Sequence, residues 1–434
     1  MSEFESMHAL VARFQALGAK RIFFKALSEN DNSKQQIYLG GSFEVLTFFP
    51  YGDVTANSDL KDPTFKAQLQ FWWVTPEETG PAPNAKLILY PRYPEVRLSG
   101  FLLGAPLSPS NHLQPIPKDK RRGFDGRVLF MGTTEDGRTL AYLAPASTPL
   151  ALEALEARAK QIDNELFIEL PLPDTVAGDS KQSVIAAIRA IQDRGFVASV
   201  RIKSGQVVPY SARNGGGYTL EALLGIAPNG KADPDYLGWE IKAFSGGRIT
   251  LMTPEPDKGF YGEQGVGVFV RRYGRYDQLK DRSYFTGVHR FGATRPDTGM
   301  TLGLAGYDCS TGKISDVNGS ILLLDRNEEL AAAWSFSSLL THWNRKHASA
   351  AYVPYVSDRD AIRYRYTNPI LMGEQTDFSR YLAAIAAGAV YYDPGSKVEA
   401  ISSKPKVKAR SQFRIGPANL PMLYRHFEKI DCQG

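Results

Sequence analysis

A run of helix-forming residues at 149–163 (PLALEALEARAKQID) divides this chain into two segments of different character. The run contains no glycine, so it predicts a helical connector over 149–165 rather than a flexible linker. The chain has 434 residues, which is too long for one ordinary hydrophobic core. We therefore predict two domains, at 1–148 and 166–434, joined by this connector.

The first segment consists mainly of short β-rich runs, which glycine, proline, asparagine and aspartate separate. Short strands between turn residues are typical of a barrel or a sandwich. The first fifteen residues (MSEFESMHALVARFQ) instead have the pattern of an amphipathic helix. The predicted strands are Arg21–Lys25, Gln36–Leu39, Lys66–Trp73, Lys86–Tyr90, Glu95–Leu98 and Gly126–Phe130.

The second segment alternates between helical and strand patterns, which predicts an α/β arrangement. Two strands, Trp239–Phe244 and Ile249–Met252, are expected to form a hairpin around the turn at 245–247. The glycine run 215–217 lacks the Gly-Lys-Ser/Thr ending of a phosphate-binding loop, so it favours close backbone packing or a turn. Helices are predicted at 183–192, at 219–224 with Thr219 as its N-cap, at 327–347 and at 376–388.

Composition excludes several classes of protein. The two cysteines, Cys309 and Cys432, exclude a disulfide framework and a cysteine-based zinc site, and they favour a reducing cytoplasm. No signal peptide pattern and no apolar run of about 18 residues is present, so we expect no membrane partner. A net charge of +5 is compatible with nucleic-acid binding only where cations cluster locally.

The segment Asp235-Tyr-Leu-Gly-Trp-Glu240-Ile-Lys242 carries the strongest chemical signal. Alternate residues of a strand point to the same face, so Glu240 and Lys242 would project together, with Asp235 just upstream. Two carboxylates suit Mg²⁺, and a neighbouring ammonium can hold or polarise an attacking water. Two carboxylates and an ammonium in this arrangement predict phosphodiester hydrolysis, although the same pattern also arises by chance on solvated strands.

Two acidic residues leave alternatives open. Asp233 competes with Asp235 for the first ligand position, and Pro234 favours Asp235 because its fixed φ would aim one carboxylate in and the other out. Glu221 lies fourteen residues before Asp235 and could join the metal site or orient its water. By itself, Glu221 would more simply complement a helix dipole.

An ordered set of short segments resembles the MvaI/BcnI restriction endonucleases, which are relatives of MutH and Sau3AI within the PD-(D/E)XK nuclease fold. The resemblance implies that Asp235 and Glu240 bind Mg²⁺, that Lys242 serves the attacking water and that Glu221 is an auxiliary acid. MutH-type sequences place the aspartate two residues further from the glutamate, where Asp233 lies. The segments are Gly217–Gly225, Asp235–Lys242, Ile249–Pro254, Phe285–Arg290, His342–His347 and Ala351–Pro354.

The first segment has a resemblance of its own. Lys25–Asp31, Gln36–Leu39 and Glu95–Leu107 are similar to the B3-like effector domain of EcoRII, a β-barrel that grips a short DNA site with two arms. The resemblance implies DNA contacts by Lys34 on the first arm and by Glu95 and Arg97 on the second. Arginine would pair with guanine and glutamate with cytosine. A cross-strand salt bridge between Glu95 and Arg97 is the alternative.

Other cations alternate with aromatic residues or cluster on one strand. In a DNA enzyme such groups contact phosphates and grooves, and otherwise they are solvated faces with snorkelling side chains. His347 also fits a helix residue satisfied within the fold. The segment 396–414 carries six cations against Glu399 and predicts an edge strand with a basic face. The remaining candidate DNA contacts are Arg271, Arg272, Lys346, His347, Arg363 and Arg365.

These features predict an α+β / α/β two-domain chain: a B3-like β-barrel followed by a PD-(D/E)XK restriction endonuclease-like fold. The expected function is a monomeric, bacterial, cytoplasmic, Mg²⁺-dependent type II endonuclease that cuts double-stranded DNA, with CCWGG or CCSGG implied by the resemblance. The first domain would bind a second site as effector, as in type IIE enzymes, and raise activity by allostery or tethering. The alternatives are a MutH-like strand-specific nickase and a DNA-binding regulator with an inactive nuclease domain. The intact D-x4-E-x-K pattern argues against the inactive domain.

Overall fold

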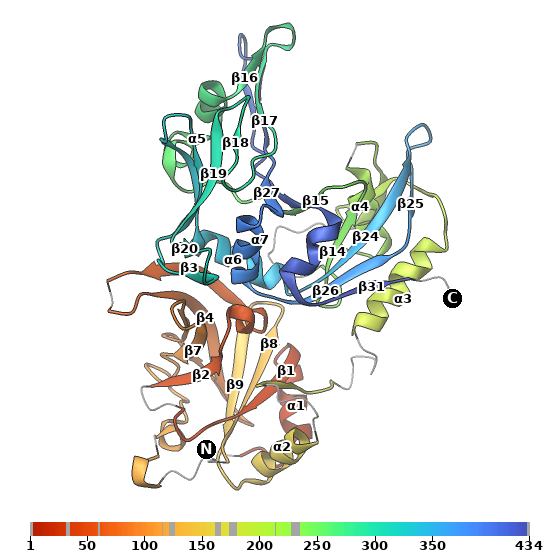
Figure 1. Cartoon of the computed structure of the whole chain (residues 1–434). Coiled ribbons are helices and arrows are strands. Elements are labelled where there is room, and N and C mark those ends of the chain that lie inside the picture. Colours follow the sequence, from red (N-terminus) through yellow and green to blue (C-terminus); the bar gives the residue numbers. More distant parts are fainter. Residues whose placement is uncertain are drawn as a thin grey trace. The chain divides into compact units, whose positions relative to one another are not determined.

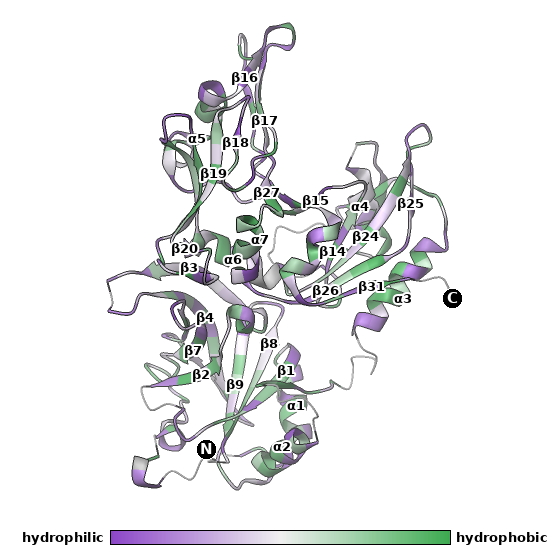
Figure 2. Ribbon diagram, in the orientation of Figure 1, coloured by the Kyte–Doolittle hydropathy of each residue, from purple (hydrophilic) through white to green (hydrophobic). Residues whose placement is uncertain are grey.

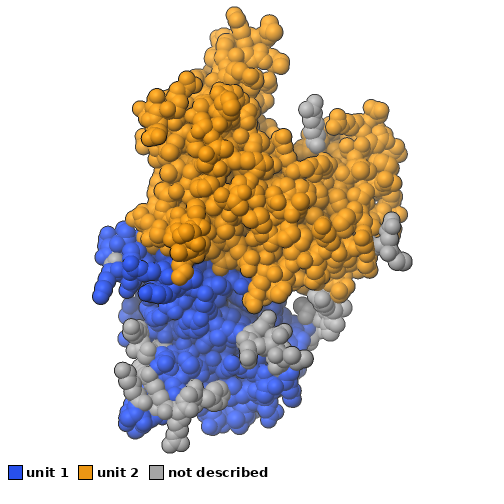
Figure 3. All heavy atoms as spheres, viewed as in Figure 1, with its two compact units in different colours: residues 1–178 blue, residues 179–434 orange. Residues whose placement is uncertain are grey.

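The computed structural model describes residues 3–31, 35–59, 61–114, 116–120, 126–160, 166–172, 180–212, 214–226 and 235–431. The chain divides into two compact units, residues 1–178 and 179–434 (Figure 3). None of the described helices is long and apolar enough to cross a membrane.

The predicted connector forms part of the first unit. Its described portion contains α2 (Pro149–Ala159), which Thr148 caps by accepting a hydrogen bond from the backbone N–H of Ala151. Leu150, Ala151 and Ala154 of this helix lie in the hydrophobic core of unit 1. The division between the units therefore falls at 178/179 rather than at 149–165, because the apolar face of α2 is buried in unit 1.

Unit 1 is built on one ten-stranded sheet with the order β10-β1-β8-β9-β4-β6-β7-β2, in which β3 and β5 also pair with β4. The pairs are antiparallel except β4 with β9. All six predicted strands are present. The described pairings leave the sheet open between β10 and β2, so a closed B3-like barrel stays a prediction. The strands are β1 (Ala19–Ala26), β2 (Gln36–Gly40), β3 (Tyr51–Asn57), β4 (Thr64–Val74), β5 (Thr79–Ala82), β6 (Lys86–Tyr90), β7 (Glu95–Ser99), β8 (Val128–Thr134), β9 (Arg138–Ala144) and β10 (Ile168–Glu169).

The amphipathic helix predicted at the start of the chain is α1 (Met7–Ala16). Leu10 and Phe14, one turn apart, are fully buried, and they join α2 and one face of the sheet in the same core. Burial of each such side chain contributes roughly 1.5–3 kcal/mol. Gly132 on β8 is required here, because a Cβ at that position would lie 2.7 Å from the ring of Phe14.

The central sheet of unit 2 has the order β11-β25-β24-β26-β31, and β14 pairs with β24 in parallel. Two helices, α3 (Ser180–Gln192) and α4 (Gly215–Leu223), share a hydrophobic cluster with Ile241 and Val353 on one face of this sheet. Figure 2 shows hydrophobic and hydrophilic residues on different faces of α3. The strands are β11 (Val197–Ala198), β14 (Glu240–Phe244), β24 (Ser349–Asp358), β25 (Arg363–Tyr366), β26 (Ile370–Thr376) and β31 (Tyr424–Ile430).

Three predictions for unit 2 are wrong. β14 and β15 (Ile249–Met252) do not form a hairpin, because β14 pairs with β24 and β15 pairs with β30 (Phe413–Ile415). The helix predicted from 327 begins at Phe336, since residues 330–335 form the buried strand β23 (Leu330–Ser335) beside β22. Thr219 lies inside α4, where its hydroxyl bonds to the backbone of Val200, and Asn214 is the N-cap.

Smaller sheets and helices complete unit 2, including a projection that contains β16 and β17 (Figure 1). The helices are α5 (Gly259–Tyr273), α6 (Phe336–His347) and α7 (Phe378–Ala386). The remaining strands are β12 (Val200–Lys203), β13 (Gln206–Pro209), β16 (Arg275–Asp277), β17 (Arg282–Thr286), β18 (Thr294–Arg295), β19 (Met300–Ala305), β20 (Tyr307–Asp308), β21 (Lys313–Ile314), β22 (Ser320–Leu324), β27 (Val390–Tyr392), β28 (Gly395–Glu399) and β29 (Lys406–Lys408).

Candidate active site

Glu240 and Lys242 lie together at the start of β14. The parallel register places Glu240 level with Ala350 and Lys242 level with Tyr352. Both side chains point away from the Ile241 face that packs against α3 and α4. Oε1 of Glu240 accepts a hydrogen bond from Nζ of Lys242 at 2.7 Å, and Glu240 is only 2% exposed. The structure therefore places the carboxylate and the ammonium in direct contact.

Asp235 lies in the turn that leads into β14. Tyr236 and Trp239 close this turn with two backbone hydrogen bonds of 3.0 and 2.8 Å. Oδ2 of Asp235 accepts a hydrogen bond from the backbone N–H of Ile241 at 3.3 Å. This bond holds the Asp235 carboxylate at the strand start that also presents Glu240. Asp233, the alternative first ligand, lies outside the described residues.

Glu221 lies on α4 and is partly buried. Its negative charge contributes, after burial and the neighbouring tyrosines, to raising the pKa of Tyr366 on β25. In the part of the chain that the structure describes, no three acidic, histidine or cysteine side chains converge as a cation site. The role of Glu221 as an auxiliary acid stays a prediction.

A buried pair of tyrosines lies beside this strand. Tyr352 on β24 and Tyr424 on β31 place their hydroxyl oxygens 2.7 Å apart, and both side chains are at most 2% exposed. Burial raises the pKa of Tyr352, and the charge of Glu240 raises it further. Both hydroxyls therefore stay protonated, and one donates to the other. The sequence offered no signal for this pair, because its members are 72 residues apart.

The candidate DNA contacts of unit 1 are partly organised on β7. Glu95 and Arg97 form an ion pair of 2.5 Å along this one strand, not across two strands. Arg97 also donates to Oε1 of Gln36 at 3.0 Å and lies 5.0 Å from the centre of the Tyr90 ring. The guanidinium is thus fixed from three sides. Lys34 lies outside the described residues.

The four candidate arginines of unit 2 fall into two groups. On α5, Arg272 pairs with Glu329 at 2.9 Å and lies 4.4 Å from the centre of the Phe260 ring, while Arg271 donates to the backbone oxygen of Gly267. On β25, Arg363 and Arg365 are exposed and both lie over the ring of Phe196, at 5.6 and 5.4 Å. In Arg272, Arg363 and Arg365 the guanidinium group itself lies over an aromatic ring, which holds the charge at the surface in a fixed place.

The end of α6 does not offer His347 to DNA. The side chain is fully buried, and its ring centre lies 4.3 Å from that of Trp343, one helical turn earlier. The sequence pattern could not decide whether His347 contacts DNA or packs inside the fold, because positions four apart share one helix face whether that face is buried or exposed. Lys346 belongs to the same helix, and its side chain lies outside the described residues.

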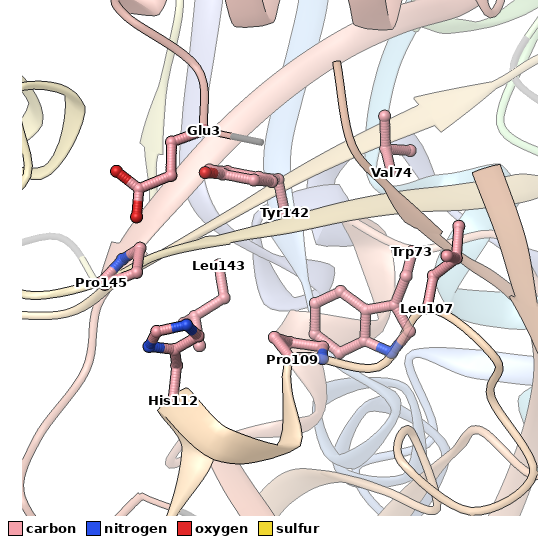
Figure 4. A pocket seen from close by; sticks show the side chains of 9 residues that line it. All are labelled: Glu3, Trp73, Val74, Leu107, Pro109, His112, Tyr142, Leu143 and Pro145. Atoms are coloured by element: carbon pink, nitrogen blue, oxygen red, sulfur yellow. The ribbon is translucent and has the colours of Figure 1, made fainter. Parts of the chain in front are cut away.

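A small pocket in unit 1 is too small to be a nucleotide-binding site. Its cavity of about 20 Å³ has the volume that a single water molecule needs, so it is far too small for a nucleotide. Figure 4 shows its lining residues: Glu3, Trp73, Val74, Leu107, Pro109, His112, Tyr142, Leu143 and Pro145.

Comparison with known proteins finds a match in one protein family. Residues 185–424 match the MvaI/BcnI restriction endonuclease family. A search of curated proteins finds no match. Among solved structures, a complex of restriction endonuclease MvaI with cognate DNA is 17% identical, covers 58% of this chain and 99% of that chain, and has a TM-score of 0.46. MvaI in the absence of DNA is 17% identical, covers 59% of this chain and 100% of that chain, and has a TM-score of 0.33.

Proposed function

Because this chain belongs to the MvaI/BcnI restriction endonuclease family and is a site-specific deoxyribonuclease, we propose that Asp235, Glu240 and Lys242 form its Mg²⁺-dependent active centre. The observation that carries this proposal is the 2.7 Å contact between Glu240 and Lys242 at the start of β14. The bond from Ile241 to Asp235 adds a second carboxylate at that strand start. Two carboxylates are the hard oxygen donors that Mg²⁺ prefers.

The residues divide the chemistry between them. When bound, Mg²⁺ would be held by Asp235 and Glu240 and would supply positive charge beside the scissile phosphate. The ammonium of Lys242 has three N–H donors, one of which engages Glu240. Another can hold the attacking water in line with the bond that breaks. Attack at phosphorus expels the 3′ oxygen and leaves 5′-phosphate and 3′-hydroxyl ends.

Asp235→Asn tests this assignment. The variant keeps an oxygen that can accept the Ile241 hydrogen bond but loses the charge that a cation needs. We expect plasmid cleavage in Mg²⁺ to be lost while specific binding in Ca²⁺ stays measurable, because groove contacts do not depend on this carboxylate. Asp233→Asn is the matched control. Cleavage that survives Asp235→Asn and disappears in Asp233→Asn would transfer the role to Asp233.

We further propose that unit 1 binds a second copy of the recognition site and raises cleavage, with CCWGG or CCSGG as the first sites to test. The fixed guanidinium of Arg97 beside Glu95 and Gln36 supports this role, because a held arginine can present two N–H donors to guanine. In the full chain, Arg97→Ala should abolish stimulation by added cognate duplex without removing basal cleavage. Stimulation equal to that of wild type would rule this surface out.

A digest of supercoiled plasmid distinguishes cleavage of both strands from nicking of one strand. A type II endonuclease proceeds to linear DNA, whereas a strand-specific nickase stops at the open circle. Run-off sequencing of the products would then return the site and the cut position. Open circle as the final product would overturn cleavage of both strands.

A further inference from the structure

The four-stranded sheet β16-β17-β28-β29 of the projection (Figure 1) has one apolar face. Phe285 and Val398 on this face are buried. The ring of Phe269 on α5 lies 4.9 Å from that of Phe285, and a Cβ added at Gly267 of α5 would lie 3.3 Å from Val407. Helix α5 therefore covers this face, and the alternate residues of each strand point to the opposite face.

The strand register arranges the opposite face in two rows that each cross all four strands. The first row, which we call the mixed row, contains Asp277, Arg282, Glu399 and Lys406. The second, which we call the cationic row, contains Arg275, Tyr284, Lys397 and Lys408. The mixed row alternates in charge from strand to strand, whereas the cationic row contains no acid.

Cross-strand pairs of opposite charge stabilise a sheet, and like charges directly opposite one another destabilise it. Arg282 and Glu399 of the mixed row are 3.8 Å apart. In the cationic row, Lys397 lies directly opposite Lys408, although Lys397 reaches along its own strand to Glu399 at 2.5 Å. Among the described residues, neither Arg275 nor Lys408 forms an ion pair with a carboxylate, and the charge of Lys408 only adds to the lowering of the Glu399 pKa, after Lys397 and Arg282. The mixed row holds two acids and two cations, whereas the cationic row holds three cations and no acid. Glu399 engages Lys397, so Arg275 and Lys408 supply the positive charge that is left for an external anion.

The cationic row also has the stiffness that an anion site needs. Nε of Arg275 donates to the hydroxyl of Tyr284 at 2.7 Å, and its guanidinium lies 4.9 Å from the centre of that ring. A planar guanidinium held on an aromatic ring loses little further freedom on binding phosphate. Lysines on an edge strand also discourage edge-to-edge pairing. That explanation applies equally to Lys406 and Lys408 and does not account for Arg275 on the opposite edge of the sheet.

We propose that the cationic row binds backbone phosphates of duplex DNA outside the hydrolytic centre. This inference rests on the proposed function in taking DNA as the ligand. The row would add affinity that is independent of sequence and sensitive to salt, because neutralised phosphates release counterions.

The salt dependence of binding tests the row against its neighbour. The double variant Arg275→Gln/Lys408→Gln removes two charges of the cationic row. Its matched control, Lys406→Gln/Lys313→Gln, removes one charge of the mixed row and one exposed charge on β21. With cognate duplex in Ca²⁺, the slope of log Kd against log salt should fall by about 2 in the test variant, since each lost phosphate contact removes about 0.9. The control should keep the wild-type slope, and equal slopes in both variants would overturn the inference.

A second measurement needs no variant and therefore does not depend on variant folding. Lysines of the wild-type chain are acetylated with and without duplex DNA, and the modified sites are quantified by mass spectrometry. DNA should protect Lys408 more strongly than Lys406, two residues away on the same face, and should leave Lys313 unprotected. Equal modification of Lys408 with and without DNA would overturn the inference. Plasmid cleavage by the same preparation is scored separately, so that failure of the nuclease assignment and failure of the row are distinguished.

Discussion

Nζ of Lys242 lies 2.7 Å from Oε1 of Glu240, and the two side chains share one face of β14. The Glu240 side chain is 3% exposed and that of Lys242 is 17% exposed, so the carboxylate is charged in a poorly solvated place. The ammonium offsets much of the cost of burying that charge. The same contact therefore serves both folding and the proposed chemistry. The effect of substitutions at Glu240 and Lys242 must be measured both on cleavage and on the free energy of unfolding.

Lys242→Gln should lower the cleavage rate about 10²- to 10⁴-fold, the usual contribution of a positioned proton-transfer group. It should also lower the free energy of unfolding by about 1.5–3 kcal/mol, because Glu240 loses a charged hydrogen-bond partner. Urea denaturation and plasmid cleavage measure the two effects. The double variant Glu240→Gln/Lys242→Gln should regain stability without regaining activity. Activity in either variant near that of wild type would exclude Lys242 from the chemistry.

Removal of the buried ion pair in unit 1 should destabilise that unit. Nζ of Lys25 lies 2.8 Å from Oδ2 of Asp31, and both side chains are at most 3% exposed. Asp31 also accepts backbone N–H bonds from Ser28 and Tyr38. Asp31→Asn leaves the ammonium buried without its counter-charge and should cost about 3–5 kcal/mol.

Hydrogen exchange of the β1 and β2 amides would measure that loss. Adding Lys25→Met to Asp31→Asn removes the unpaired charge and should recover most of the protection. If the single and double variants exchange equally fast, the ion pair is not the source of the stability.

The hydroxyl pair beside the active centre should show strong coupling. Tyr424→Phe leaves the hydroxyl of Tyr352 without the partner that lies 2.7 Å away, and a buried polar group left unpaired costs about 1–3 kcal/mol. Tyr352→Phe/Tyr424→Phe removes both hydroxyls and should cost less than the sum of the single variants. A double-variant cycle by urea denaturation measures the coupling. Additive single effects would show that the two hydroxyls do not support each other.

Acidification should destabilise the fold through His289. This residue is fully buried, and burial, followed by the charge of Arg295, lowers its pKa from 6.5 to about 4. Between these two pKa values the unfolded chain binds a proton at His289 and the folded chain does not. The contribution of His289 to the free energy of unfolding is therefore complete above pH 6.5 and is lost as the pH falls toward 4. Between pH 7 and pH 5 the loss attributable to this group is on the order of 2 kcal/mol.

The control for the pH effect is His289→Asn, which has no group that titrates in this range. Urea denaturation at the two pH values should show a smaller acid loss in the variant than in wild type. An identical acid loss in both proteins would assign the pH dependence to other groups.

Local sequence determined the features of this protein that follow from short-range geometry. The two-residue spacing of Glu240 and Lys242 is enough to place them on one strand face, because side chains alternate along any strand. The amphipathic pattern of α1 and the β-rich runs of unit 1 likewise needed only neighbours in the chain. The glycines that begin α4 were expected to give close backbone packing or a turn, and they lie in a helix where a Cβ at Gly216 would overlap the ring of Tyr355. The sequence indicated the close approach but not the distant residue that makes it.

Only the tertiary structure decided which distant segments meet. The turn signal after β14 favoured a local hairpin, but β24 supplied a better partner more than a hundred residues later. The burial of His347, the contact of Tyr352 with Tyr424 and the cationic row all depend on which surfaces face one another. Strand pairing and helix packing are set by contacts between residues far apart in the chain, and the free energy of those contacts is not encoded in any local pattern.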